Sequence, residues 1–156
     1  MSAKLGDQLC FALYATSRAV TGAYREGLAA LGLTYPQYVT LLSVWEQDGQ
    51  TVGQLGESLD LDSGTLSPLL RRLEASGLVQ KKRGEGDERT VRVYATAKSR
   101  ELEPQVSGLR CDVEERVGLT ATQSRDLRAV LASLRTRLEG GIALTDASPI
   151  DRSDTQ

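Results

Sequence analysis

The chain has 156 residues, 40% of them hydrophobic and 26% charged, with a formal net charge of −2. This length suits one domain, or one compact module with added dimerisation helices, and the composition is that of a globular protein. Because the chain has no histidine, histidine-based catalysis, most zinc sites and the usual pH switch are excluded, and we expect neither a metal nor a cofactor. No apolar run approaches the roughly 20 residues that span a bilayer, and the N-terminus lacks a signal-peptide core. A cytoplasmic protein without a membrane partner is therefore expected.

The first 50 residues are predicted to form helices. Residues 7–31 have apolar side chains near helical spacing, with Asp7 as the candidate N-cap and Gly32 as the residue that ends the helix. A second helix is predicted from about Pro36, because proline suits the first turn, and the D-G pair at 48–49 ends it.

The next segment, residues 51–95, changes from a helical to a strand pattern. A short helix is predicted over 51–59 and a second one, after a turn and cap at 61–63, up to Ser76. Pro68 lies inside the second helix and predicts a mild kink or a late start. Residues 78–82 and 90–94 then alternate as two strands around a polar loop at 84–88, which predicts a β-hairpin with basic roots.

This order of elements is typical of a winged helix–turn–helix, whose second helix reads base edges in the major groove of DNA. Residues 71–92 contain seven bases and four acids in a chain that is negative overall, as a surface that contacts phosphates requires. The helix N-terminus itself favours phosphate. Arg89 at the hairpin tip is predicted to enter a minor groove, with Asp87 orienting it. A small α+β core with a solvated hairpin is the alternative. The predicted reading residues of the second helix are Ser63, Thr65, Ser67, Arg71 and Arg72.

Two more helices are predicted after the hairpin. The first covers 97–117 with a local irregularity at Pro104, and Thr120 begins the second in a T-x-x-Q capping box. The last helix carries a leucine-rich stripe and ends at Gly140-Gly141, and residues 142–156 are predicted to be a flexible tail. The apolar stripes of the terminal helices need a partner surface, which predicts a two-fold homodimer; packing back onto their own module is the alternative.

The fold class that we predict is therefore mainly α with a small β-hairpin, a winged helix–turn–helix flanked by N- and C-terminal dimerisation helices. The predicted boundaries are 1–50 for the N-terminal helices, 51–95 for the DNA-binding unit, 96–141 for the C-terminal helices and 142–156 for the tail.

Cys10 is one of only two cysteines and falls in the first turn of the predicted helix. There the helix macrodipole lowers the pKa of a thiol, although the carboxylate of Asp7 opposes this effect. A thiolate reacts with peroxides to give a sulfenic acid, which a second thiol traps as a disulfide, and Cys111 is the candidate partner. The alternative is that Cys10 is a small buried packing residue.

Three motifs resemble one known family. The hairpin sequence G-D-E-R-T-V-R-V-Y-A-T resembles the wing of MarR-type regulators. The segments L-C-F-A-L-Y-A-T-S-R, L-T-Y-P-Q-Y and L-D-S-G-T-L-S-P-L-L resemble the organic hydroperoxide resistance regulator (OhrR) branch of that family, in its two-cysteine type, and the resemblance covers about residues 5–140.

The resemblance implies a homodimeric repressor that binds operator DNA when it is reduced and releases it when organic hydroperoxides oxidise the sensor cysteine. Cys10 stands at the sensor position, and Tyr24 and Tyr35 stand at positions whose hydroxyls, from the facing subunit, hydrogen-bond to that thiol. Cys111 lies in the region of the resolving cysteine of two-cysteine members. One competing hypothesis is a MarR-type repressor that responds to a small aromatic ligand. The other, an enzyme that reduces peroxides with Cys10 and Cys111, lacks a thioredoxin-like pattern, so we expect no enzyme.

Overall fold

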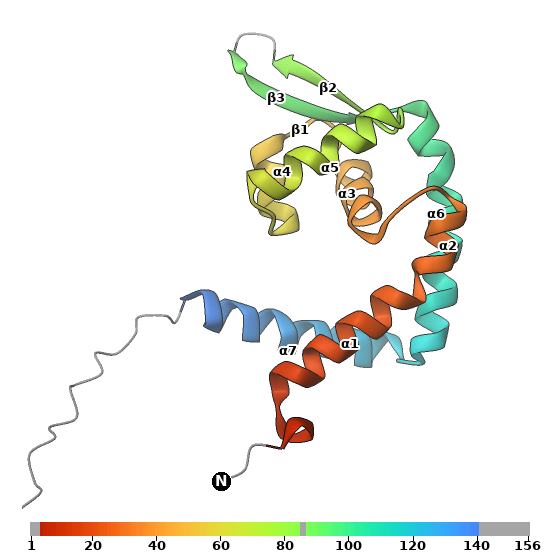
Figure 1. The fold of residues 1–156 in the computed structure, drawn as a ribbon, viewed down its shortest axis with the longest axis vertical. Coiled ribbons are helices and arrows are strands. Elements are labelled where there is room, and N and C mark those ends of the chain that lie inside the picture. Colours follow the sequence, from red (N-terminus) through yellow and green to blue (C-terminus); the bar gives the residue numbers. More distant parts are fainter. Residues whose placement is uncertain (1–3, 85–86, 141–156) are drawn as a thin grey trace, which may run out of the picture. The chain divides into compact units, whose positions relative to one another are not determined.

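A computed structural model describes residues 4–84 and 87–140, and the side chains of these residues except 84 and 87–89. The chain divides into two units, Met1–Val117 and Gly118–Gln156. Figure 1 traces the first unit from the N-terminal helices through a winged helix–turn–helix to a long helix. None of the helices in the described ranges is long and apolar enough to cross a membrane.

The N-terminal region contains more breaks than its sequence predicts. A 3₁₀ turn, η1 (Leu5–Asp7), precedes α1 (Leu9–Ala23), and α2 (Arg25–Ala30) follows directly. The predicted N-cap at Asp7 is wrong: the backbone N–H of Asp7 closes the 3₁₀ turn on Lys4, and Gln8 is the N-cap of α1. Cys10 therefore occupies the second position of α1 and not the third. Gly32 takes a positive φ of 69° after α2, as predicted for the end of this region.

The helix–turn–helix is built on well-capped helices. Thr34 and Gln37 form a capping box that begins α3 (Tyr35–Glu46), with Pro36 in its first turn. Thr51 begins α4 (Val52–Leu59) with a second capping box, and the Asp62 carboxylate accepts the Thr65 backbone N–H at the start of α5 (Ser63–Ala75). The late start that Pro68 suggested is absent, because α5 already begins at Ser63 and contains the proline.

The wing is part of a three-stranded antiparallel sheet with strand order β1-β3-β2. Strands β2 (Val79–Gly84) and β3 (Asp87–Ala95) extend into the predicted loop, and Gly84 pairs with Asp87. The extra strand, β1 (Gln50–Thr51), was not predicted; it pairs Gln50 with Val93 and ties the start of α4 to the wing.

One hydrophobic core joins these elements to the long helix α6 (Ala97–Val117), whose predicted bounds are confirmed. The buried Trp45 ring of α3 donates its Nε1–H to the Ser99 hydroxyl of α6 at 3.2 Å. α6 continues through Pro104 without ending. The largest fully buried side chains are Leu28, Leu41, Leu55, Leu66, Leu70, Leu73, Val44, Val93 and Val106.

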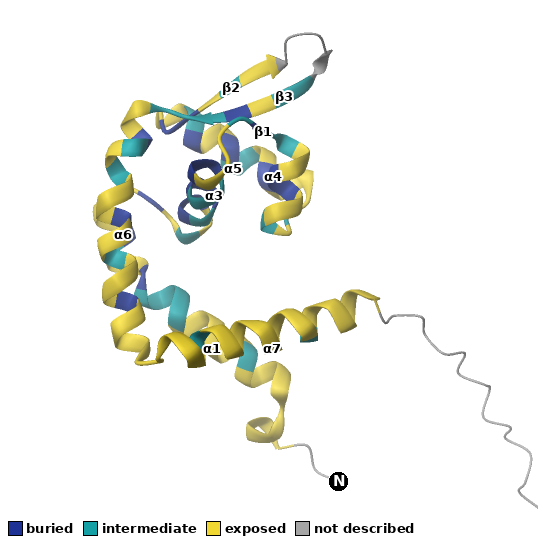
Figure 2. Cartoon of the chain, turned by 180° about the vertical axis from the view of Figure 1, so that it is seen from behind, coloured by how far each residue is buried: buried dark blue, intermediate teal, exposed yellow. Residues whose placement is uncertain are grey.

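The second unit is described through α7 (Ala121–Gly140), which Thr120 and Gln123 begin with the predicted capping box. No residue of α7 is buried, and Figure 2 shows most of the helix in the colour of exposed residues. Its predicted apolar stripe stays largely in solvent, with Val130 64% and Leu138 62% exposed. The predicted tail at 142–156 lies outside the described residues.

Candidate nucleic-acid interface and thiol site

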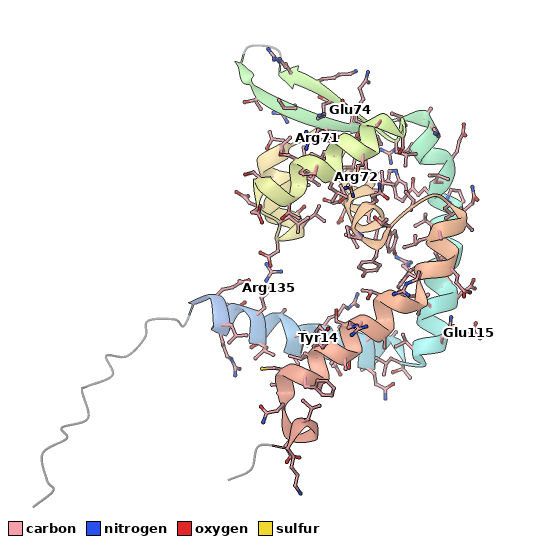
Figure 3. All side chains as sticks on the ribbon, in the orientation of Figure 1. Tyr14, Arg71, Arg72, Glu74, Glu115 and Arg135 are labelled. Atoms are coloured by element: carbon pink, nitrogen blue, oxygen red, sulfur yellow. The ribbon has the colours of Figure 1, made fainter. Side chains whose placement is uncertain are left out.

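The helix α5 has the two faces that a recognition helix needs. Leu66, Leu70 and Leu73 are buried in the core, and this fixes the rotation of the helix about its axis. Arg71 and Arg72 lie away from this buried face, and Figure 3 labels both on this helix. All five predicted reading residues are exposed: Ser63, Thr65, Ser67, Arg71 and Arg72.

The carboxylate of Asp62 caps the N-terminus of α5. Asp62 accepts the Thr65 N–H at 2.9 Å and the Thr65 hydroxyl at 3.0 Å. These bonds, chiefly the backbone one, hold the pKa of Asp62 below its usual range. The negative charge opposes a phosphate at this helix end, so the phosphate contacts expected there are better assigned to the arginines further along the helix.

The wing supplies further positive charge, part of which is neutralised within the fold. Lys81 forms an ion pair with Glu74 at 2.8 Å, and Lys82 lies over the Tyr94 ring at 5.3 Å. Arg92 donates to the backbone oxygen of Gly49 at 2.8 Å and so fastens β3 to the turn before β1. The predicted minor-groove residues of the hairpin tip have side chains outside the described part of the chain: Asp87 and Arg89.

The two cysteines are free and exposed, Cys10 on α1 and Cys111 on α6. Exposure argues against Cys10 as a packing residue within one chain, because a packing thiol would be buried. Within residues 4–84 and 87–140, no group of three side chains of the types that hold metals converges.

The predicted tyrosines lie together, and a third tyrosine joins them. The Tyr24 and Tyr35 ring centroids are 5.5 Å apart, and Tyr38 lies 5.3 Å from Tyr24 and 5.7 Å from Tyr35. Besides burial, the two neighbouring phenols act on each other: Tyr38 lowers the pKa of Tyr24, and Tyr24 raises the pKa of Tyr38, as expected if the Tyr38 hydroxyl is the donor between them. Burial raises the pKa of both phenols, and it does so strongly for Tyr38, so both keep their protons at neutral pH. The sequence indicates Tyr38 as the third member, because Tyr35 and Tyr38 are three residues apart and therefore share one face of α3.

The geometry of α1 separates the sensor thiol from the tyrosines of the same chain. Cys10 lies near the start of α1, and Tyr24 follows directly after its end. Fourteen residues at the rise of an α-helix place the two Cα atoms about 21 Å apart. Side chains cannot bridge this distance, so a bond between Cys10 and Tyr24 requires a second copy of the chain.

The part of α6 that contains Cys111 lies near Tyr24 of the same chain. The adjacent Arg110 and the nearby Glu114, an ion pair at 3.6 Å, both act electrostatically on Tyr24. Gly27 of α2 packs directly against the Leu109 side chain. A second subunit that brings its Tyr24 to Cys10 therefore also brings the region of its Cys111.

Comparison with known proteins gives consistent results. Residues 23–105 match the family described as transcriptional regulator SarA/Rot. The chain is 46% identical to the HTH-type transcriptional regulator TtmR of Methylorubrum extorquens (strain PA1), over 91% of this chain and 73% of the relative. It is 43% identical to the organic hydroperoxide resistance transcriptional regulator of Bacillus subtilis (strain 168), over 87% and 90%.

Among solved structures, the chain is similar to AbfR of Staphylococcus epidermidis. AbfR described as reduced and bound to DNA matches with a TM-score of 0.73 and 32% identity, over 86% of this chain and 94% of that one. AbfR described as overoxidized and bound to DNA gives 0.73 and 33%, over 87% and 93%. A disulfide-formed structure of AbfR gives 0.62 and 34%, over 87% and 90%.

The fold, with its exposed recognition helix, and these relatives lead to one assignment. The chain is a DNA-binding transcriptional regulator and belongs to the MarR-like winged-helix family that includes the SarA/Rot regulators and the organic hydroperoxide resistance regulators.

Proposed function

We propose that the protein is a redox-sensing transcriptional repressor that acts in the cytoplasm. As a reduced homodimer it binds a two-fold operator, and oxidation of Cys10 by organic hydroperoxides releases the DNA. The observation that carries this proposal is the separation within one chain of an exposed thiol and a cluster of tyrosines. The two parts have complementary chemistry and meet only if two chains pair.

Exposed apolar side chains on the terminal helices favour the formation of a dimer. Leu9 is 60% exposed and Phe11 41% exposed on α1, beside Cys10 in the sequence. On α7, Val130 and Leu138 are exposed to a similar degree. Burying such side chains contributes about 25 cal/mol per Å² of apolar surface, which favours association of these helices with those of a second subunit.

The sensing step is the oxidation of one thiol. The Cys10 thiolate attacks the outer peroxide oxygen, the O–O bond breaks, and the departing alkoxide takes a proton to become an alcohol. Cys10 becomes a sulfenic acid. Hydroxyl hydrogen bonds from the partner's Tyr24 and Tyr35 stabilise the thiolate before this step, because a phenol is a donor to an anion.

The second step uses Cys111 of the partner subunit. Its thiol attacks the sulfenic sulfur, the S–O bond breaks, and the oxygen leaves as water with the thiol proton, which forms a disulfide. A disulfide needs Cα atoms within about 7 Å, so α1 of one subunit must approach α6 of the other. Because Trp45 and Ser99 join α6 to the core of the DNA-binding unit, this movement alters the spacing of the two recognition helices. A solved structure of a relative named as overoxidized AbfR bound to DNA supports a need for this second step.

A second candidate function has one observation in its favour. A cavity of about 350 Å³ lies between α3 and α6, with Tyr38, Leu42, Trp45 and Val106 among its lining residues. Its size and its aromatic walls suit a small aromatic ligand. Arg110 would attract a carboxylate there, but Glu46 and Glu103 line the same cavity and oppose an acid, which favours thiol sensing as the input.

The test is DNA release by three proteins: wild type, Cys10→Ser and Cys111→Ser. Each reduced protein is bound to a fluorescent duplex selected from random sequence by the wild type, and anisotropy is followed after cumene hydroperoxide is added. We expect release by the wild type, none by Cys10→Ser, and slow or incomplete release by Cys111→Ser. Release by Cys10→Ser at the wild-type rate would contradict the proposal. Release of that variant by aromatic acids would favour the second candidate.

A further inference from the structure

We infer that Tyr38 is a positioning residue of the thiol site: its hydroxyl donates a hydrogen bond to the Tyr24 oxygen and thereby directs the Tyr24 proton toward Cys10 of the other subunit. This inference rests on the proposed thiol site and adds a residue that touches neither the thiol nor the peroxide. It assigns a role to the one buried tyrosine that the sensing mechanism above leaves unused.

Tyr38 is held rigidly against the other two rings. Its side chain is 3% exposed, against 8% for Tyr24, while Tyr35 is only half-buried. The Tyr38 ring stacks on Tyr24 with an interplanar angle of 29° and meets Tyr35 edge-on at 67°. Tyr35 and Tyr38 lie on one face of α3, whose start is fixed by the Thr34–Gln37 capping box. The cluster thus sets the position of the Tyr24 hydroxyl before any partner arrives.

Because each hydroxyl has a single proton, the direction of the hydrogen bond between Tyr38 and Tyr24 determines where the Tyr24 proton can point. A phenol donates one hydrogen bond and accepts others. If Tyr38 donates to Tyr24, the Tyr24 proton is free to point outward at a thiolate. If Tyr24 donated to Tyr38 instead, it would present only lone pairs to the thiolate and repel it. A thiolate partner therefore selects the first direction, in which the two bonds form a chain and strengthen each other.

The charges around the cluster are compatible with this direction. Desolvation, followed by the neighbouring phenols, raises the pKa of Tyr38 well above its ordinary value, so Tyr38 keeps the proton that it must donate. Arg110 acts on both Tyr24 and Tyr38 and lowers the pKa of each, while Glu114 raises the pKa of Tyr24. The arginine and the glutamate are paired with each other on α6, so neither presents an unbalanced charge to the hydroxyl chain.

The experiment measures the pKa of Cys10 in a Cys111→Ser background, where it is the only thiol. The rate of alkylation by iodoacetamide is recorded against pH, and the reaction with cumene hydroperoxide is timed at pH 7. The proteins compared are the parent, Tyr38→Phe, Tyr24→Phe and the double variant. Tyr94→Phe serves as the matched control, because it removes a phenol hydroxyl from β3 and leaves its ring in place.

We expect Tyr38→Phe to raise the Cys10 pKa and to slow the peroxide reaction by about two- to tenfold, the effect of one net hydrogen bond. Because Tyr38 acts through Tyr24, the double variant should react no more slowly than Tyr24→Phe alone. An unchanged alkylation profile for Tyr38→Phe, even with a lower melting temperature, would reduce Tyr38 to packing and overturn the inference. So would full additivity in the double variant. If Tyr24→Phe also leaves the profile unchanged, the proposed thiol site fails as well.

Discussion

The hydrogen bond that joins α6 to α3 of the DNA-binding unit gives a quantitative prediction. Ser99 is fully buried in α6 and accepts the Trp45 Nε1–H at 3.2 Å. Ser99→Ala leaves this indole N–H buried without an acceptor, which costs about 1–3 kcal/mol. The other lost bond matters less, because the Thr96 carbonyl that Ser99 contacts also accepts the Arg100 N–H at 3.1 Å. The better helix propensity of alanine offsets roughly 0.5 kcal/mol, so we expect a net loss of about 0.5–2.5 kcal/mol.

Urea unfolding of the reduced protein measures this loss, with an unchanged m-value as evidence that the native state keeps its compactness. Ser107→Ala is the matched control, because it makes the same change at an exposed position of the same helix and should lie within about 0.5 kcal/mol of wild type. In a Trp45→Phe background the donor is gone, so Ser99→Ala should lose most of its effect. An equal effect in both backgrounds would refute the hydrogen-bond reasoning.

Three further predictions concern the DNA surface, acid stability and the subunit arrangement. Arg71→Ala should weaken DNA binding and lower the slope of log affinity against log salt by about 1 if the side chain contacts a phosphate; an unchanged affinity would remove it from the interface. The ion pair with Lys81 holds the pKa of Glu74 below its usual range, so its contribution exists at neutral pH and is lost as the pH falls through that value. Glu74→Gln should therefore be less stable by about 0.2–1 kcal/mol at pH 7 and equal to wild type in acid, as urea unfolding at both pH values will measure. In a mixed dimer of one Tyr24→Phe chain and one Cys10→Ser chain, the remaining Cys10 faces the intact Tyr24 of the other chain. It should therefore regain the wild-type alkylation rate. A rate as slow as in the Tyr24→Phe homodimer would place the tyrosine in the same chain as the thiol.

Local signals in the sequence predicted the elements that have strong end markers. Thr120 and Gln123 gave the start of α7, and Gly32 and Gly77 gave the ends of α2 and α5. The break between α1 and α2 had no such marker, because Tyr24 itself keeps a right-handed helical backbone with φ −80° and ψ −16°. β1 contains only two residues, which is too short for an alternating pattern to appear.

The thiol site was accessible from the sequence only in part. The spacing of Tyr35 and Tyr38 places them on one helix face, but their contact with Tyr24 depends on how α2 packs against α3. The fastening of Arg92 to Gly49 and the use of Asp62 as a cap also arise from tertiary structure. The sequence pattern therefore predicted which basic residues form the surface. It did not predict which of their charges already form ion pairs or hydrogen bonds within the fold.

The central claim is that the oxidation state of Cys10 governs DNA binding. The most direct measurement is the Kd of one protein sample for one duplex in three states: reduced, oxidised by one equivalent of cumene hydroperoxide per subunit, and reduced again by dithiothreitol. Intact mass spectrometry reports the Cys10 state in each. We expect oxidation to weaken binding by about tenfold or more, equal to about 1.4 kcal/mol, and the reductant to restore it. An unchanged Kd with Cys10 fully oxidised to the disulfide would contradict the claim.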